Sequence, residues 1–230
     1  MKKFWKYTAQ GMTGFILFIC VMLVGACSNP AIRPESEQQT SNIKSILILP
    51  FHNVSNLYEQ NIQVRCYLCG QIMTTGYVPD SGGPFLTSEL IWLMEKQQGY
   101  TVLSSEGSQD MLSGLSGTGN DAEQYLKLYI NAGKRAGADA VLIGHIFRFV
   151  DRKGNRASVE SPASVAFDLH LIDVDSGKIV WTANFDQTQR PLSDNLLELG
   201  SFIKRKASWV SAEELAQGGL EDILRRFPKP

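Results

Sequence analysis

The sequence has few residues of the types that ligate metals or carry covalent catalysis. Its 230 residues include four cysteines and three histidines, which are His52, His145 and His170. The histidines lack the short spacing of common zinc motifs, so we expect neither a metal site nor a catalytic base. His145 and His170 fall in predicted strands, where a solvent-facing or hydrogen-bonded histidine is the simplest interpretation.

The sequence also has no excess of basic over acidic residues. The chain holds 22 basic and 23 acidic residues, for a formal charge of −1, whereas a nucleic-acid-binding protein would normally be basic. The glycine-rich stretch 113–119 is followed by Asn120 and Asp121, not by the lysine that a phosphate-binding loop requires. No serine stands in a nucleophile-elbow motif. We therefore expect neither a nucleic-acid partner nor an enzyme.

The amino-terminal segment has the pattern of a secretory signal. Met1–Gln10 carries three lysines and no acid, and Gly11–Leu23 is almost wholly apolar. Val24-Gly-Ala26-Cys27 resembles the lipobox of bacterial lipoproteins, which implies cleavage between Ala26 and Cys27 and a lipid on Cys27. An uncleaved anchor helix is the alternative. Loss of the three lysines would take the formal charge from −1 to −4.

These features predict three regions. Residues 1–26 are a signal peptide, 27–43 a polar, flexible tether, and 44–230 a single periplasmic domain. Several acyl chains anchor a protein to a membrane more firmly than one. The covalent lipid on Cys27 is the only cofactor we expect. Because Ser28 follows the cysteine where an aspartate would favour inner-membrane retention, we predict an outer-membrane anchor that faces the periplasm.

The spacing of apolar residues predicts an α/β (α+β) domain, with a mixed sheet of about five strands and helices packed on it. The continuous apolar run 46–49 is typical of a strand buried on both faces. Ser81 is placed to cap the first helix, and Asp175 to serve a turn between strands. We expect strands at 44–50, 100–103, 140–150, 164–173 and 178–187, and helices after 81, from 121, at 192–206 and at 212–226.

Cys66-Tyr-Leu-Cys69 is the sharpest local motif in the sequence. It lies in the segment 52–83, whose role the sequence does not indicate, next to a half-exposed strand predicted at 62–68. In an oxidising compartment the pair favours a local disulfide between Cys66 and Cys69. Two free thiols, and metal or redox chemistry, are the alternatives.

Three consecutive cations, Lys204, Arg205 and Lys206, lie between Phe202 and Trp209. The simplest interpretation is a solvated helix end, where positive charge suits the helix dipole. The alternative is a contact with an anionic membrane or with an acidic partner.

Three runs carry a family resemblance: 46–51 (ILILPF), 136–144 (AGADAVLIG) and 169–183 (LHLIDVDSGKIVWTA). They resemble a group of envelope lipoproteins that includes the amino-terminal domain of TolB, the curli secretion lipoprotein and the lipoprotein activators of penicillin-binding proteins. The resemblance covers most of 44–190. Its motifs are structural, so they imply a fold more directly than a function.

We therefore expect a lipid-anchored, non-catalytic interaction or assembly module that activates or recruits a cell-envelope complex. A ring-forming secretion component of the curli type is the alternative, and a redox or hydrolytic enzyme is the least favoured. The expected partners are the membrane, through the lipid, and an envelope protein, with homo-oligomers left open.

Overall fold

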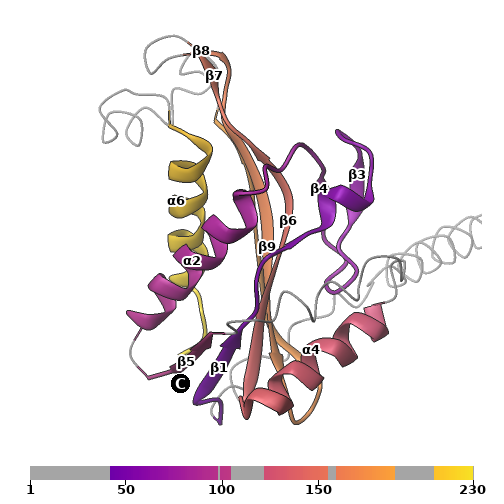
Figure 1. Ribbon diagram of the computed structural model, residues 1–230, viewed down its shortest axis with the longest axis vertical. Helices are drawn as coiled ribbons and strands as arrows, with labels where there is room; N and C mark the ends of the chain where they lie inside the picture. Colours follow the sequence, from indigo (N-terminus) through magenta and orange to yellow (C-terminus); the bar gives the residue numbers. More distant parts are fainter. Residues whose placement is uncertain (1–41, 98, 105–121, 155–158, 190–209, 230) are drawn as a thin grey trace, which may run out of the picture. The chain divides into compact units, whose positions relative to one another are not determined.

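Residues 42–229 are described by the computed structural model of the chain, apart from 98, 105–121, 155–158 and 190–209 (Figure 1). The predicted signal peptide and Cys27 lie outside the described residues. So do almost all of the tether, the predicted helix at 192–206 and the basic cluster at 204–206. Among the described residues, none of the helices combines the length and the apolar character needed to span a bilayer.

A mixed sheet of six strands forms the centre of the domain. Five follow one another in the order β10 (Ile179–Thr188), β9 (Ser164–Asp173), β6 (Ala140–Val150), β1 (Ser45–Ile48) and β5 (Thr101–Ser104). The short β2 (His52–Asn53) also pairs with β6. β1 runs parallel to β5 and β6, whereas β6, β9 and β10 are antiparallel neighbours. The predicted mixed sheet is confirmed. Of its six strands, β2 is the one that the sequence did not predict.

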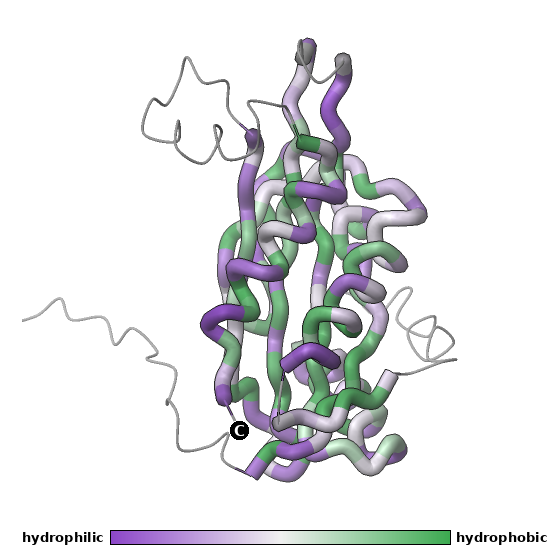
Figure 2. The backbone as a smooth tube through the Cα atoms, turned by 90° about the vertical axis from the view of Figure 1, so that its left-hand side faces the viewer, coloured by the Kyte–Doolittle hydropathy of each residue, from purple (hydrophilic) through white to green (hydrophobic). Residues whose placement is uncertain are grey.

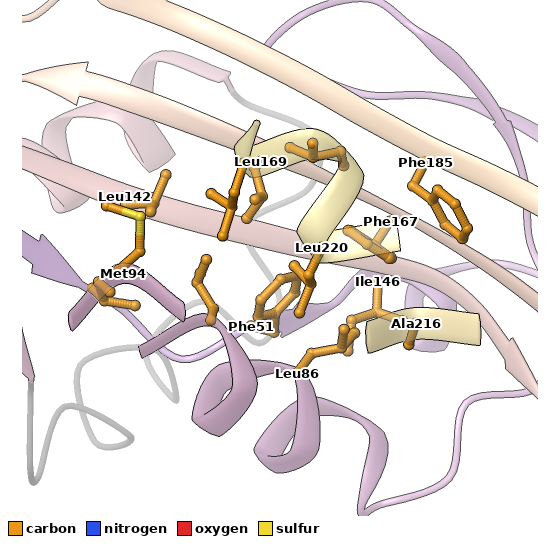
Figure 3. Packing of buried hydrophobic residues seen from close by; sticks show 14 of the residues in the cluster. Phe51, Leu86, Met94, Leu142, Ile146, Phe167, Leu169, Phe185, Ala216 and Leu220 are labelled. Carbon is orange, nitrogen blue, oxygen red and sulfur yellow. The ribbon is translucent and has the colours of Figure 1, made fainter. Parts of the chain in front are cut away.

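Helices cover both faces of this sheet (Figure 1). On one face, α2 (Gly82–Glu95) and α6 (Ala212–Leu224) contribute to the larger apolar core, part of which Figure 3 shows. On the other face, α4 (Ala122–Ala136) packs in a second core. Hydrophobic and hydrophilic residues alternate along the backbone of these elements in Figure 2. Three layers result, with the sheet in the middle.

β1 is buried on both faces, as its continuous apolar run predicts. Ile46 and Ile48 lie in the core under α2 and α6, and Leu47 and Leu49 lie in the core under α4. Successive side chains of a strand point to opposite faces, so a central strand covered on both sides needs an apolar residue at every position.

Two local predictions about capping and turns are wrong. Ser81 precedes α2, but it has helical dihedral angles and its side chain makes no cap hydrogen bond. Asp175 was predicted to stabilise the turn before β10, but Asp173 does so instead. The Asp173 carboxylate accepts hydrogen bonds from the backbone amide and the hydroxyl of Ser176. At α6, Ser211 and Glu214 form a reciprocal capping box.

The segment 52–83 crosses the α4 face beside β6. After a 3-10 turn, η1 (Val54–Leu57), it forms a hairpin of β3 (Gln63–Arg65) and β4 (Ile72–Thr74). A second small hairpin, β7 (Lys153–Gly154) with β8 (Val159–Ser161), extends the far end of the sheet. The inner side of the 52–83 segment builds a third apolar cluster with Phe147 and Ala166. Four of the five exposed large apolar side chains of the described residues lie in this segment: Leu57, Ile62, Ile72 and Tyr77.

Candidate functional site

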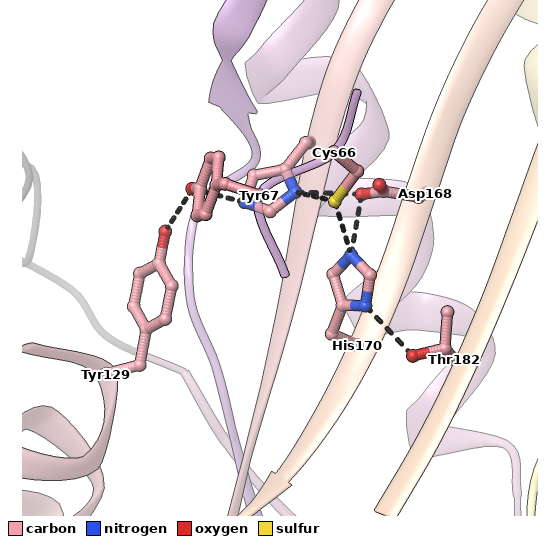
Figure 4. Close-up of polar contacts among 7 residues, drawn as sticks. Cys66, Tyr67, Tyr129, Asp168, His170 and Thr182 are labelled. Carbon is pink, nitrogen blue, oxygen red and sulfur yellow. Dashed lines mark hydrogen bonds and ion pairs between the residues drawn. The ribbon is translucent and has the colours of Figure 1, made fainter. Parts of the chain in front are cut away.

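A buried polar cluster lies where the β3–β4 hairpin meets the sheet (Figure 4). His145 on β6 is the register partner of Asp168 on β9, and directly opposite residues share a face. His170 is two residues beyond Asp168 and so points to the same face. Cys66, immediately after β3, approaches the same point from the hairpin. Three segments far apart in the sequence thus converge.

One carboxylate oxygen is at the centre of the cluster. Asp168 Oδ1 lies 2.9 Å from His145 Nδ1 and 3.1 Å from His170 Nε2. Cys66 Sγ lies 3.5 Å from His170 Nε2 and 4.0 Å from His145 Nδ1. The relative exposure is 3% for Cys66 and zero for the other three residues, so bulk water does not reach them.

Further side chains hold the two imidazoles in orientation. His145 Nε2 lies 2.7 Å from the hydroxyl of Tyr67, which lies 3.0 Å from the hydroxyl of Tyr129. His170 Nδ1 lies 3.0 Å from Thr182 Oγ1 on β10. Each ring therefore has one nitrogen in the cluster and the other in a hydrogen bond outside it.

The pKa values of the cluster reflect burial and the mutual attraction of its groups. Burial alone would raise the pKa of Asp168, but the two adjacent imidazoles outweigh it and hold that pKa well below its usual range. Burial lowers the pKa of His145. For His170, the attraction of Asp168 overcomes burial and raises the pKa. Without a further ligand, these shifts favour positive charge on His170, beside Asp168, over positive charge on His145.

The cluster contains the residue types of a cysteine–histidine–aspartate triad, but the environment of Cys66 opposes nucleophilic catalysis. A hydrogen bond with Cys69, followed by burial, raises the pKa of the Cys66 thiol. Reactive cysteines are instead partly exposed and have a lowered pKa.

A surface depression lined by Leu93, Gln97 and Leu224 lies between α2 and α6 and includes no residue of the cluster.

Of the two forms predicted for the sheet histidines, solvent-facing or hydrogen-bonded, the structure shows the hydrogen-bonded one. His145 and His170 are hydrogen-bonded, as one interpretation held, but neither faces solvent. Asp168 lies in the middle of β9. Cys66 and Cys69 are both free thiols, one buried and one exposed. The disulfide between them stays a prediction, as does the lipid on Cys27.

A signal for the cluster was present in the sequence but incomplete. The alternation Asp168-Leu-His170 puts two polar side chains on one face of an otherwise apolar strand. Their meeting with His145 depends on a register shift between Ile146 and Arg148. Continuing the register of 148–150 without this bulge would place Leu169 opposite His145 and turn the histidine to the other face.

The chain matches the family model described as the peptidoglycan-synthase activator LpoB over residues 88–186, somewhat less than half of its length. The matched region includes His145, Asp168 and His170 but not Cys66. It confirms the resemblance to the lipoprotein activators of penicillin-binding proteins that the sequence motifs indicated. No sequence among the curated proteins matches this chain.

Several solved structures are similar at low identity. The PelC dodecamer from Paraburkholderia phytofirmans is 12% identical, over 79% of this chain and 84% of that one, with a TM-score of 0.45. Lipoprotein GNA1162 from Neisseria meningitidis is 16% identical, over 71% and 93%, with a TM-score of 0.39. The LpoB C-terminal domain from Salmonella enterica is 16% identical, over 66% and 89%, with a TM-score of 0.38. At these TM-scores they carry no functional argument. Over residues 88–186 the chain is thus similar to a peptidoglycan-synthase activator.

Proposed function

We propose that this protein is a lipid-anchored, non-catalytic module of the bacterial envelope that binds and activates a peptidoglycan synthase. The match of residues 88–186 to the peptidoglycan-synthase activator LpoB carries this proposal. The matched residues include most of α2 and all of β5, α4, β6 and β9, so the similarity extends through the centre of the sheet.

The amino-terminal sequence supports the proposal because it predicts a lipid anchor in the membrane. A lipid on Cys27 and a polar tether to residue 43 would hold the domain within about 60 Å of the bilayer surface, because an extended chain spans at most ~3.3–3.6 Å per residue. Confinement to a thin layer raises the effective concentration of a domain toward partners in that layer. A synthase that works between the membranes is such a partner, and the outer membrane is the proposed anchor.

The buried cluster is consistent with a non-catalytic role. The Cys66 thiol is buried and has a raised pKa, so Cys66 is not an available nucleophile. Activation would then proceed through contact between the proteins, with no chemistry on a substrate.

The direct test is crosslinking in living cells followed by mass spectrometry on the full, lipidated chain. We expect a peptidoglycan synthase among the reproducible crosslinked partners, and we expect Cys27→Ala to abolish those crosslinks by removing the anchor. A Cys69→Ser variant, which keeps the anchor, is the matched control. Repeated recovery of no synthase would contradict the proposal.

The exposed apolar side chains of the 52–83 segment are the first contact residues to test. Exposed apolar patches on soluble domains commonly mark protein contact sites. Ile72 is 48% exposed on this segment, and Trp92, on α2, is exposed to a similar degree at 46%. We expect Ile72→Glu to reduce the crosslinks to the synthase and Trp92→Glu to leave them. The reverse pattern would place the contact on the helical face.

The remaining sequence-based predictions stay open alongside this proposal. Contact of Lys204, Arg205 and Lys206 with a membrane or an acidic partner falls outside the described residues. No observation among the described residues favours the ring-forming alternative, which stays a prediction, as does a homo-oligomer.

A further inference from the structure

We propose that Cys66, His145, Asp168 and His170 form a tetrahedral zinc(II) site that fastens the β3–β4 hairpin to the sheet. Each residue offers one ligand atom, and the four atoms lie within 4.8 Å of one another. Zinc in proteins is bound by this mixture of thiolate sulfur, imidazole nitrogen and carboxylate oxygen. Calcium and magnesium prefer oxygen ligands throughout, so this donor set does not suit them.

Four of the six distances between the ligand atoms come close to those of a tetrahedron around zinc, and all six lie within 4.8 Å. With zinc–ligand bonds of ~2.0–2.3 Å, neighbouring ligand atoms lie roughly 3.3–3.6 Å apart. The pairs around Asp168 Oδ1 measure 2.9 and 3.1 Å, and those around Cys66 Sγ measure 3.5 and 4.0 Å. Each differs from the tetrahedral range by about half an ångström or less. Side-chain movements that bring all six distances into this range would admit the ion.

The surroundings of both histidines are those of metal ligands. A ligating histidine almost always engages its other ring nitrogen in a hydrogen bond that fixes the ring and its tautomer. His145 would bind through Nδ1, with Nε2 at 2.7 Å from the Tyr67 hydroxyl. His170 would bind through Nε2, with Nδ1 at 3.0 Å from Thr182 Oγ1.

Charge and an orphaned oxygen provide an independent argument. Asp168 is buried with its second oxygen, Oδ2, lacking a hydrogen-bond partner among the described residues, so its negative charge is costly without a nearby cation. A zinc ion with one thiolate, one carboxylate and two neutral imidazoles would make the cluster neutral overall. Zinc would thus compensate a carboxylate with no lysine or arginine paired to it among the described residues.

The geometry assigns this site a structural role. All four ligands come from the protein and all are buried, which leaves no open position for a substrate, as in structural zinc sites. Cys66 is 79 residues from His145 and 104 from His170 along the chain. The ion would therefore tie a short hairpin, whose own sheet has only two strands, to the centre of the domain. It would also fix the segment that carries Ile62 and Ile72.

The first experiment measures metal directly on the full chain, purified in detergent without chelator. We expect about one zinc per chain by elemental mass spectrometry, and a melting temperature that falls on chelation and recovers with zinc. Replacement by cobalt(II) should give the visible spectrum of a tetrahedral ion and a thiolate-to-cobalt band. Absence of zinc binding, or an octahedral cobalt spectrum without the thiolate band, would overturn the proposal.

Variants then test the ligand set. Cys66→Ser should lose the thiolate–cobalt band, whereas Cys69→Ser, the other thiol of the same motif, should keep the band and the stoichiometry. Loss of both in Cys69→Ser would overturn the assignment of ligands. A Cys66–Cys69 disulfide in protein isolated from the periplasm would also overturn it, because the bond consumes the thiolate.

Thr182→Val tests the site without removing a ligand, in case the ligand variants fail to fold. Thr182 is exposed on the outer strand β10, and its hydroxyl lies 3.0 Å from the far nitrogen of His170. We expect zinc affinity to fall ~10–100-fold, the usual effect of removing a hydrogen bond to a ligating histidine, with little change in the metal-free melting temperature. An unchanged affinity would contradict binding through His170 Nε2. Zinc binding is measured without a partner, so its failure would leave the proposed function untouched.

Discussion

His145 Nδ1 and Asp168 Oδ1 face each other across β6 and β9 at 2.9 Å, and neither side chain is exposed to solvent. The two residues are register partners, so the backbone pairing of the strands sets their contact. A carboxylate at this depth is stable only with close partners, and both imidazoles lie within hydrogen-bond distance of Oδ1. The cluster is therefore sensitive to loss of any one member.

Removing the Asp168 carboxylate should strongly destabilise the domain. We expect Asp168→Ala to lower the free energy of unfolding by about 3–5 kcal/mol, because it breaks a buried pair and leaves both imidazoles without their acceptor. Urea unfolding with a chelator present measures this independently of any metal. Asp175→Ala is the control: this exposed aspartate should change stability by less than about 0.5 kcal/mol. Equal effects in the two variants would contradict the account of the cluster.

Adjacent glycines of α6 should respond in opposite directions to alanine. A Cβ at Gly218 would meet nothing within 4 Å, so Gly218→Ala should stabilise by about 0.5–1 kcal/mol through helix propensity. A Cβ at Gly219 would lie 2.8 Å from atoms of the Phe185 ring. Gly219→Ala should therefore destabilise by about 1–3 kcal/mol. Thermal unfolding of the two variants checks the packing of α6 on β10, and a stabilising Gly219→Ala would refute it.

Asp139 should make stability depend on pH where β1 and β6 begin. Its carboxylate accepts hydrogen bonds from the backbone amides of Lys44 and Ser45 at 2.9 and 2.8 Å, and these bonds lower its pKa. Because the pKa is lower in the folded protein, the stabilisation is complete above the unfolded pKa of about 3.9 and is lost as the pH falls through the folded value.

The comparison of Asp139→Asn with the unchanged chain measures this effect. We expect a loss of about 1 kcal/mol at pH 7, since the bonds are exposed to solvent, and a smaller difference at pH 3. Urea unfolding at the two pH values gives the two differences. A difference that stays constant between them would show that the charge of Asp139 contributes nothing.

The capping box of α6 supplies a further test. Ser211 accepts a hydrogen bond from the backbone amide of Glu214, and the Glu214 carboxylate accepts one from the backbone amide of Ser211. Ser211→Ala should cost about 0.5–2 kcal/mol in urea unfolding. Ser81→Ala provides the comparison, because Ser81 makes no cap hydrogen bond and its loss should be nearly neutral. Equal costs would contradict the difference between the two helix starts.

Much of the fold could be predicted from local patterns. The bounds predicted for β6 and β9, 140–150 and 164–173, are those observed, because apolar runs and the flanking turns define them locally. The both-sided burial of β1 followed from its unbroken apolar run. Ser81 failed as a cap because residue type indicates a cap only where the backbone is extended, and here it is helical.

The cluster could not be predicted in the same way, because it depends on register. One bulge near Phe147 decides whether His145 shares a face with Asp168 or with Leu169. Cys66 joins them through a hairpin of only three-residue strands, whose docking position no local pattern specifies. The spacing of Cys66, His145, Asp168 and His170 along the sequence therefore does not indicate that the fold brings them together.

The most direct test of the central claim is a peptidoglycan synthesis assay with purified components. The full chain is added in detergent to the synthase identified by crosslinking, and the rates of glycan polymerisation and peptide crosslinking are measured with and without it. We expect a saturable increase in at least one rate, with Trp92→Glu retaining the increase and Ile72→Glu reducing it. Rates that stay unchanged at saturating amounts of the folded protein would contradict the assignment as a synthase activator.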